Sequence, residues 1–199
     1  MDEIILFYAT DNKSKLHNMY YRLRKFPIKV ICPDDIHLHI DVEENGASAV
    51  ENAVLKAKAY SKEIPWPVVA GDSGMTISGI KSADQPGLYV RRVKGKVLSD
   101  DEMIEYYSRL AISAQDECYI HYYTGLALIT KEELYTMELK DKPMILSATP
   151  NINRYHRGNP LDVISKLEDG RYFNNLSDEE RTALDAVNEK KFETVSSFV

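Results

Sequence analysis

The chain has few of the features that mark secreted, membrane-spanning or repeat proteins. It contains only two cysteines, Cys32 and Cys118, which are too far apart in the sequence for a metal-binding pair, so we expect two buried, reduced thiols. It has no run of eighteen apolar residues, no basic leader after Met1, no internal repeat and no low-complexity tail. These absences predict a soluble, cytoplasmic protein that does not bind membranes.

The charge is negative overall but unevenly distributed. A formal net charge of −6 argues against a protein that binds nucleic acid polymers, because duplex binding requires a broad cationic surface. Basic residues nevertheless concentrate in residues 13–29, which contain no acid, and in residues 81–96. Such runs are typical of a solvated surface or of a cationic pocket for an anionic ligand, and the sequence leaves both interpretations open.

Length and composition indicate one globular unit. A chain of 199 residues that is 44% hydrophobic can bury one sizeable core. We expect a single domain with two lobes. The core lobe would comprise about residues 1–115 and 165–199, and an antiparallel extension would comprise residues 116–164.

The start of the chain predicts a strand, a polar turn and a helix. Residues 4–9 are apolar without alternation, which indicates a central strand covered on both faces. The polar residues 10–15 lead into the helix, whose N-terminus would direct free N–H groups at one point and suit a phosphate. Lys15 adds a full charge there. An ordinary loop capped by Asp11 or Asn12 is the alternative.

Two histidines follow the second predicted strand, residues 28–31. His37 and His39 are two residues apart on a polar connection, a spacing compatible with metal ligation. The sequence shows no third ligand near them. We therefore interpret both histidines as surface residues.

Residues 43–93 contain the strongest functional pattern. Ser48 and Glu51 have the spacing of a capping box and open a predicted helix. Asn52 and Lys56 lie four residues apart on this helix and share one face. A packing helix without a functional role is the alternative.

The segment after this helix combines glycines, an acid and a hydroxyl. Residues 68–70 are a short apolar run typical of a strand, so the sequence predicts a backbone turn at residues 71–74, with Asp72 and Ser73 at its centre. Glycine permits a turn and the close approach of a ligand. A carboxylate at a strand end can hold a divalent cation or orient a water. An ordinary turn is again the alternative.

The rest of the chain is expected to add strands and capped helices. Strands are predicted at residues 118–130, 133–139 and 144–148. Capping boxes at Ser99 and Ser177 predict two more helices, the second continuing through Lys190. Residues 151–160 have the composition of a ligand loop or of an exposed crossover.

Taken together, these motifs resemble the Ham1 family of inosine and xanthosine triphosphate pyrophosphatases. The resemblance lies in Thr-Asp-Asn-Lys-Ser-Lys at 10–15, Glu-Glu-Asn-Gly at 43–46, Glu-Asn-Ala-Val-Leu-Lys-Ala at 51–57, Ala-Gly-Asp-Ser-Gly-Met at 70–75 and Pro-Gly-Leu-Tyr at 86–89. It implies an α/β fold in which an elongated mixed sheet is flanked by helices and a cleft separates two lobes.

The resemblance also implies an activity and its residues. A Mg²⁺-dependent enzyme would cleave a nucleoside triphosphate between its α and β phosphates, with damaged purine nucleotides (ITP, dITP and XTP) as substrates, and would form a homodimer. Glu44 and Asp72 would hold Mg²⁺, and Asp72 would also orient the attacking water. Catalysis would further depend on Lys15 and Lys56. Substrate binding would involve Thr10, Asn12, Lys15, Lys56, Ser73 and Gly74.

The chain departs from the family pattern in three places. Gly71 stands where the family has the first of two aspartates, so Glu43 or another acid would have to compensate. The glycine-rich Phe-Gly-Tyr-Asp-Pro segment is not legible, and residues 158–162 are the candidate for its place. The Ser-His-Arg that reads the purine 6-oxo group should fall near residues 185–187 and is absent.

Base recognition therefore needs other donors, because a 6-oxo group is a hydrogen-bond acceptor. The nearest donors are Arg154, His156, Arg157 and Asn159, and the possible stacking platforms are Tyr155, Tyr172 and Phe173. A solvent-exposed loop is the alternative for these residues. For the whole chain, two other functions stay open: a nucleotide-binding protein that has lost catalysis, and a related pyrophosphatase for other modified nucleotides, pyrimidines included.

Overall fold

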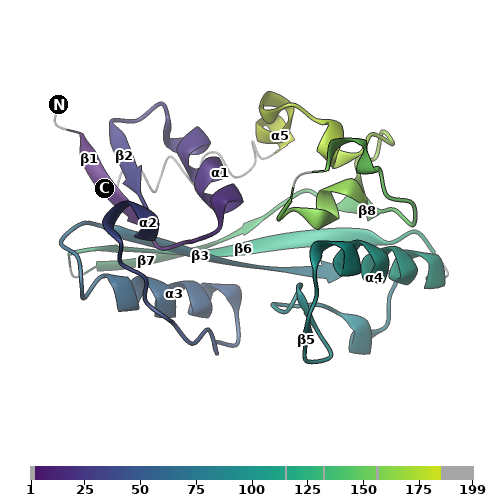
Figure 1. Ribbon diagram of the computed structural model, residues 1–199, viewed down its shortest axis with the longest axis horizontal. Helices are drawn as coiled ribbons and strands as arrows, with labels where there is room; N and C mark the ends of the chain where they lie inside the picture. Colours follow the sequence, from purple (N-terminus) through teal and green to yellow (C-terminus); the bar gives the residue numbers. More distant parts are fainter. Residues whose placement is uncertain (1–2, 115, 132, 156, 185–199) are drawn as a thin grey trace. The chain divides into compact units, whose positions relative to one another are not determined.

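The structure, a computed structural model, describes residues 3–114, 116–131, 133–155 and 157–184. Two compact units make up this part of the chain (Figure 1). Unit one comprises residues 3–73 and 123–139, and unit two comprises residues 74–122 and 140–184. These boundaries differ from the predicted ones near residues 115 and 165. The reason is that two long strands, β3 (Val68–Ile77) and β6 (Tyr119–Thr130), each contribute to both units.

The strands of unit one form part of a mixed sheet. Their order is β2-β1-β3-β6, and β7 (Glu133–Lys140) also pairs with β6. Strand β1 (Ile4–Tyr8) lies parallel to β2 (Ile28–Ile31) on one side and to β3 on the other, where Phe7 pairs with Val68. Because β1 has a partner on each side, it is an interior strand, as its unbroken apolar run predicts.

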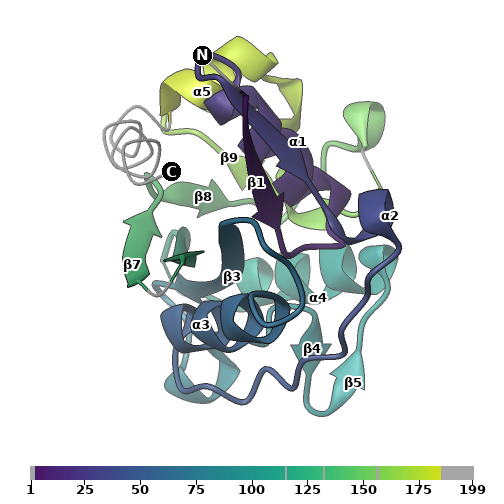
Figure 2. The same cartoon turned by 90° about the vertical axis from the view of Figure 1, so that its left-hand side faces the viewer.

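Alternation along these strands gives unit one an apolar layer on each face of the sheet. Helix α1 (Lys13–Leu23) covers one face and α3 (Ala49–Tyr60) the other (Figures 1 and 2). The layer beneath α1 contains Leu6, Tyr8, Met19, Leu23, Val69, Leu126 and Leu128. The layer beneath α3 contains Phe7, Ala9, Ala53, Ala57, Val68, Ala70 and Ala127. Consecutive residues of one strand therefore pack against different helices.

The turn predicted at residues 71–74 is wrong. Strand β3 continues from Val68 to Ile77, and neither Gly71 nor Gly74 has a positive φ. Gly71 instead provides space, since a Cβ at this position would lie 3.0 Å from Leu126 Cδ2 and 3.3 Å from the Tyr8 hydroxyl. The glycine is therefore explained by packing on the α1 face rather than by a change of chain direction.

Helix α3 begins where the sequence predicts and lies directly on the sheet. Its N-cap Ser48 accepts a hydrogen bond from the Glu51 N–H at 3.1 Å. A Cβ at Gly125 of β6 would lie only 2.3 Å from the carbonyl carbon of Ala49, so only glycine lets the helix start approach this closely. The short helix α2 (Pro33–Ile36) lies in the connection that the sequence analysis treats as polar and irregular.

Unit two has its own core around α4 (Asp100–Ser113), which begins with the predicted capping box of Ser99 and Glu102. Strand β8 (Met144–Leu146) is antiparallel to β6 and to β9 (Ser165–Lys166). The buried apolar residues include Met75, Ile77, Met103, Tyr107, Ile120, Leu146, Val163 and Ile164. The mixed α/β class, with a sheet flanked by helices, is thus confirmed.

Short elements complete unit two. They are the hairpin β4 (Arg92–Val93) and β5 (Lys96–Val97), the 3-10 helices η1 (Ser82–Asp84), η2 (Ile152–Arg154), η3 (Pro160–Val163) and η4 (Phe173–Asn175), and helix α5 (Asp178–Leu184). The capping box at Ser177 is present, but the predicted continuation of this helix to Lys190 falls outside the described residues. None of the described helices is both long and apolar enough to cross a membrane. Cys32 and Cys118 are buried and unbridged, as expected.

Candidate functional site

The part of β3 that belongs to unit one ends in two polar side chains on opposite faces of the sheet. Since Val69 faces α1, alternation directs Asp72 toward α3 and Ser73 toward α1. Asp72 Oδ2 accepts a hydrogen bond from the side-chain amide of Asn52 at 2.9 Å. Ser73 Oγ lies 3.0 Å from Thr124 Oγ1 of β6. The strand thus fixes both groups without the predicted turn.

Asn52 has no role in the sequence prediction, yet its side chain contacts two segments of the candidate site. Its side chain is polar, yet the residue is only 4% exposed on α3. Its Nδ2 donates to Asp72, and its Oδ1 accepts from the Gly46 N–H at 2.8 Å. The available signal was its position four residues before Lys56 on the same helical face, which the sequence analysis noted without giving Asn52 a role.

Lys56 pairs with an acid from the loop before α3. Its Nζ lies 2.9 Å from Glu44 Oε1, and its side chain is only 17% exposed. The neighbouring Glu43 is exposed. Glu44 is therefore the acid that the structure joins to Lys56, while compensation for Gly71 by Glu43 stays a prediction.

Lys15 reaches the same place from α1. Its Nζ donates to the Gly71 carbonyl oxygen at 3.4 Å. Burial lowers the pKa of Lys15; the charges of Asp72 and Glu44 oppose this shift, and the charge of Lys56 adds to it. The structure thus brings two ammonium groups and two carboxylates from four segments of unit one close together.

We call this group the carboxylate site; its members are Lys15, Glu44, Asn52, Lys56 and Asp72. One oxygen of each carboxylate is already held, that of Glu44 by Lys56 and that of Asp72 by Asn52. The second oxygen of each has no partner among the residues that the structure describes. Carboxylate oxygens are the ligands that hard divalent cations prefer, so the chemistry of these residues is compatible with a divalent ion.

The loop before α1 is only partly available for an anion. Asn12 is the N-cap of α1, and its Oδ1 accepts from the N–H groups of Ser14 at 2.9 Å and Lys15 at 3.1 Å. Thr10 Oγ1 in turn accepts from the Asn12 N–H at 3.2 Å. The expectation of free N–H groups is wrong for Ser14 and Lys15, because the cap satisfies both. Lys15 contributes its side-chain charge instead.

The remaining predicted substrate residues belong to unit two. Gly74 is buried in β3, and Arg154 is an exposed residue whose guanidinium donates to the Asn175 carbonyl oxygen at 3.4 Å. His156 lies outside the described residues. The expected Ser-His-Arg position at residues 185–187 also lies outside them.

Tyr155, a predicted stacking platform, is held by Asp100 at the start of α4. Its hydroxyl donates to Asp100 Oδ2 at 2.6 Å, and the Gly158 N–H donates to the same oxygen at 2.8 Å. Burial acts to raise the pKa of Asp100, but these hydrogen bonds and one from Arg91 outweigh it and hold the pKa below its ordinary value. Asp100 therefore anchors Tyr155 and Gly158 within unit two.

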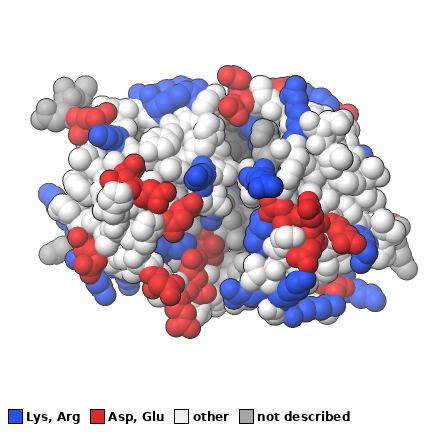
Figure 3. Space-filling view, in the orientation of Figure 1, with Lys and Arg blue, Asp and Glu red and all other residues white. Residues whose placement is uncertain are grey.

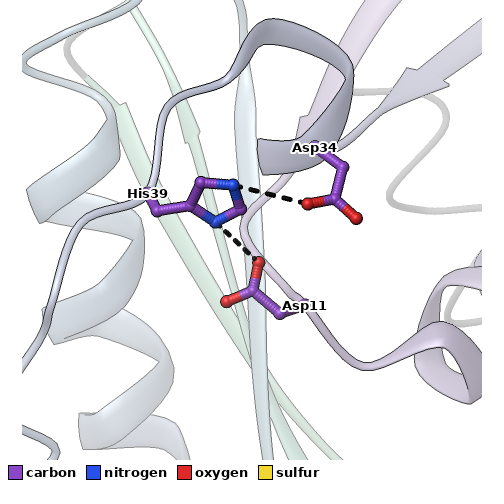
Figure 4. A group of neighbouring side chains, drawn as sticks. All are labelled: Asp11, Asp34 and His39. Carbon is purple, nitrogen blue, oxygen red and sulfur yellow. Dashed lines mark ion pairs between the residues drawn. The ribbon is translucent and has the colours of Figure 1, made fainter.

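A second group of titratable side chains in unit one consists of Asp11, Asp34 and His39 (Figure 4). His39 Nδ1 is 3.2 Å from Asp11 Oδ1, and its Nε2 is 3.4 Å from Asp34 Oδ1. We call this group the His39 cluster. The prediction that His39 is a surface residue is confirmed, but the absence of further ligands near it is wrong, because the fold brings two distant aspartates to it.

The surface charges agree with the negative net charge. Figure 3 shows acidic and basic side chains intermingled on the face that it draws, rather than one continuous basic surface.

Fold and site together define a class of protein: a mixed α/β chain in which a β-strand carries a carboxylate and the helix on each face of the sheet contributes one lysine to the same site. The Ham1 family model matches residues 6–185, and the chain belongs to the Ham1 family.

Individual relatives agree with this membership. The chain is 39% identical over 116 residues to a dITP/XTP pyrophosphatase from Coxiella burnetii, a match covering 58% of this chain and 56% of the relative. It is 37% identical over 110 residues to a dITP/XTP pyrophosphatase from Haemophilus influenzae, covering 55% of each. The chain thus spans about half the length of the curated relatives it matches. A solved Ham1 protein from Coxiella burnetii superimposes with a TM-score of 0.76 at 27% identity, covering 98% of this chain and all of that one.

Proposed function

We propose that this chain hydrolyses nucleoside triphosphates between the α and β phosphates, releasing a nucleoside monophosphate and pyrophosphate. The observation that carries the proposal is the carboxylate site, where Lys15, Lys56, Glu44 and Asp72 lie together in unit one. The names of the relatives support ITP, dITP and XTP as the substrates.

The two lysines suit the charge of a triphosphate. A polyanion needs cations to approach, and negative charge develops on the bridging oxygen as it leaves with the pyrophosphate. Lys15 would contact the phosphates from the α1 side of the sheet and Lys56 from the α3 side. Ser73, Thr10 and Asn12 would position the triphosphate near them, through the hydroxyls of Ser73 and Thr10 and the side-chain amide nitrogen of Asn12.

Glu44 and Asp72 would hold Mg²⁺ through the two oxygens described above as uncommitted. When bound, this ion supplies positive charge that stabilises the phosphate oxygens during bond cleavage. Asp72 would also orient the attacking water, whose oxygen forms the new bond to the α phosphorus as the bond to the bridging oxygen breaks. Asn52 keeps this carboxylate in place during the reaction.

Base selection would come from the loop of residues 151–160 in unit two, with Arg154 and His156 as donors to a 6-oxo group and Gly74 near the ligand. Asp100 supports this proposal because it ties Tyr155 and Gly158 to the start of α4 and so limits the conformations of the loop. We also propose a cytoplasmic homodimer, on the strength of the family resemblance. Light scattering on the purified chain would report the assembly state.

The decisive experiment measures pyrophosphate release from ITP, dITP, XTP, modified pyrimidine triphosphates and ATP in the presence of Mg²⁺. We expect release from the 6-oxo purine nucleotides and little from ATP, because a donor that binds the 6-oxo group opposes the amino group of adenine. Phosphorus NMR of the products separates pyrophosphate from two single phosphates. Release of orthophosphate alone would contradict the proposed bond.

A second candidate function is nucleotide binding without turnover. It is favoured by Gly71, which provides no carboxylate where the family pattern has an aspartate. Leu126 and the Tyr8 hydroxyl lie close to where a side chain at this position would begin. Calorimetry with ITP would then show binding while no pyrophosphate appears. Pyrophosphate from a modified pyrimidine alone would instead favour a related enzyme for other damaged nucleotides.

A further inference from the structure

The role of Asn52 extends beyond contact with one carboxylate. Its side-chain amide is buried between two segments of unit one, the strand that carries Asp72 and the loop that carries Glu44. The loop contact is to the N–H of Gly46, two residues after Glu44. One buried amide therefore connects the segments that hold both candidate metal ligands.

The orientation of this amide follows from its partners. The Gly46 N–H can only donate, so the atom facing it must be the carbonyl oxygen of Asn52, and the NH₂ group must then face Asp72. An aspartate at position 52 would place a second acid against Asp72. An apolar residue would leave a half-buried N–H and a carboxylate oxygen without these partners. Among these side chains, only asparagine satisfies both sides.

The loop has little freedom to shift against Asn52. A Cβ at Gly46 would lie 2.8 Å from Asn52 Oδ1 and 2.7 Å from Glu51 Cβ, so the backbone already approaches the helix as closely as glycine allows. One helical turn later, Lys56 holds Glu44 itself at 2.9 Å. The rigid spacing of Asn52 and Lys56 on α3 thus fixes where the two carboxylates stand relative to each other.

We propose that Asn52 is the residue that determines which divalent ion the carboxylate site selects; this inference rests on the proposed function of that site. Mg²⁺ demands nearly ideal octahedral geometry with ligand distances of about 2.0–2.1 Å, whereas Ca²⁺ accepts about 2.3–2.6 Å and irregular arrangements. Carboxylates held in a fixed arrangement suit an ion that demands a fixed geometry, whereas carboxylates that are free to move suit the ion that accepts irregular arrangements. A pair released from Asn52 loses this preference.

The test measures metal binding without nucleotide. Mn²⁺ bound to the purified chain is followed by electron paramagnetic resonance, and Mg²⁺ or Ca²⁺ is titrated in as a competitor. For Asn52→Ala we expect the dissociation constant for Mg²⁺ to rise by about tenfold to a hundredfold, the usual effect of losing a partner of a metal ligand. The constant for Ca²⁺ should rise much less, so the Mg²⁺ to Ca²⁺ preference falls.

A matched control removes another buried amide. Asn174 in unit two is 2% exposed and donates to the Asn151 carbonyl oxygen at 2.7 Å. Asn174→Ala should lower thermal stability in the same way as Asn52→Ala but leave the ion preference unchanged. If Asn52→Ala does not fold, Asn52→Ser retains a small polar group, cannot reach both partners and serves the same comparison.

The outcomes separate this inference from the proposed function. An unchanged Mg²⁺ to Ca²⁺ preference in the Asn52 variants would overturn the inference, even if the wild-type chain releases pyrophosphate. A preference that depends on Asn52 would support it, even if the wild-type chain shows no turnover and the proposed hydrolysis fails. If Asp72→Asn binds the ion as tightly as the wild-type chain does, the inference is overturned, because the ion would then lie elsewhere.

Discussion

Unit one contains two groups of charged side chains, and they differ in what surrounds them. In the carboxylate site, Asp72 is held by a nearly buried asparagine and Glu44 by a lysine that is mostly buried. In the His39 cluster all three side chains are more than half exposed. Exposed ion pairs are screened by water and lose side-chain entropy when they form, so they contribute little free energy. Charged groups lie close together in both places, and the two groups differ in the burial of the residues that hold them.

The largest expected effect comes from replacing an aspartate by asparagine in each of the two groups and comparing kcat. Asp72→Asn should lower kcat by roughly a hundredfold to a thousandfold, because it removes a carboxylate from the point where charge develops. Asp34→Asn, in the His39 cluster, should leave kcat near the wild-type value. Pyrophosphate release measures both, and circular dichroism checks that each variant folds. Near-full activity of Asp72→Asn would mean that the carboxylate site does not differ from the His39 cluster in its effect on kcat.

The next effect concerns two lysines on the same helix. Lys56→Ala should lower kcat/KM by about tenfold to a hundredfold, because a phosphate contact is lost and Glu44 is left without its partner. Lys58→Ala changes an exposed residue two positions along α3 and should have little effect. Steady-state kinetics on ITP compare the pair. Equal losses of kcat/KM in both variants would mean that the lysines of α3 act only through the net positive charge of the helix and not through a specific contact.

The pH profile provides a finer test of burial. Burial lowers the pKa of Lys15, so in the free enzyme this ammonium loses its proton at a lower pH than an exposed lysine would. The alkaline decline of kcat/KM should therefore begin below the range of an ordinary lysine. Lys15→Arg should move this decline to higher pH, since a guanidinium stays protonated. Lys13→Arg, on an exposed residue, should leave the profile in place.

The smallest effect is expected in the His39 cluster. His39→Ala should change the free energy of unfolding by at most about 1 kcal/mol, because its two ion pairs are exposed. Urea denaturation measures this value, and high salt should reduce whatever difference exists. A loss of several kcal/mol would mean that the cluster stabilises unit one far more than its exposure indicates.

Local patterns predicted the elements of the fold well. The apolar run at residues 4–9 gave an interior strand, and Ser48, Ser99 and Ser177 each mark a helix start. Such patterns succeed because caps and apolar periodicity act within a few residues of one another. The family motifs similarly predicted that Lys15, Lys56 and Asp72 belong to one site.

Other features depend on partners that are distant in the sequence. Gly71 is compatible with a turn or with close packing, and only the position of Leu126 on β6 decides between them. Strands β1 and β2 are parallel neighbours. Asp11 lies three residues after the end of β1, and Asp34 lies three residues after the end of β2. A correct strand pairing would therefore have placed the two aspartates side by side. The spacing of Asn52 and Lys56 placed the amide on the right face of its helix, but its partners Asp72 and Gly46 come from other segments and could not be read from that spacing.

The packing around Gly71 bears on what a substitution at this position would do. Alanine would already require Leu126 to yield by a few tenths of an ångström, and the carboxylate of an aspartate would lie beside that leucine and the Tyr8 hydroxyl. An acid engineered at position 71 should therefore be accommodated best together with a smaller residue at position 126.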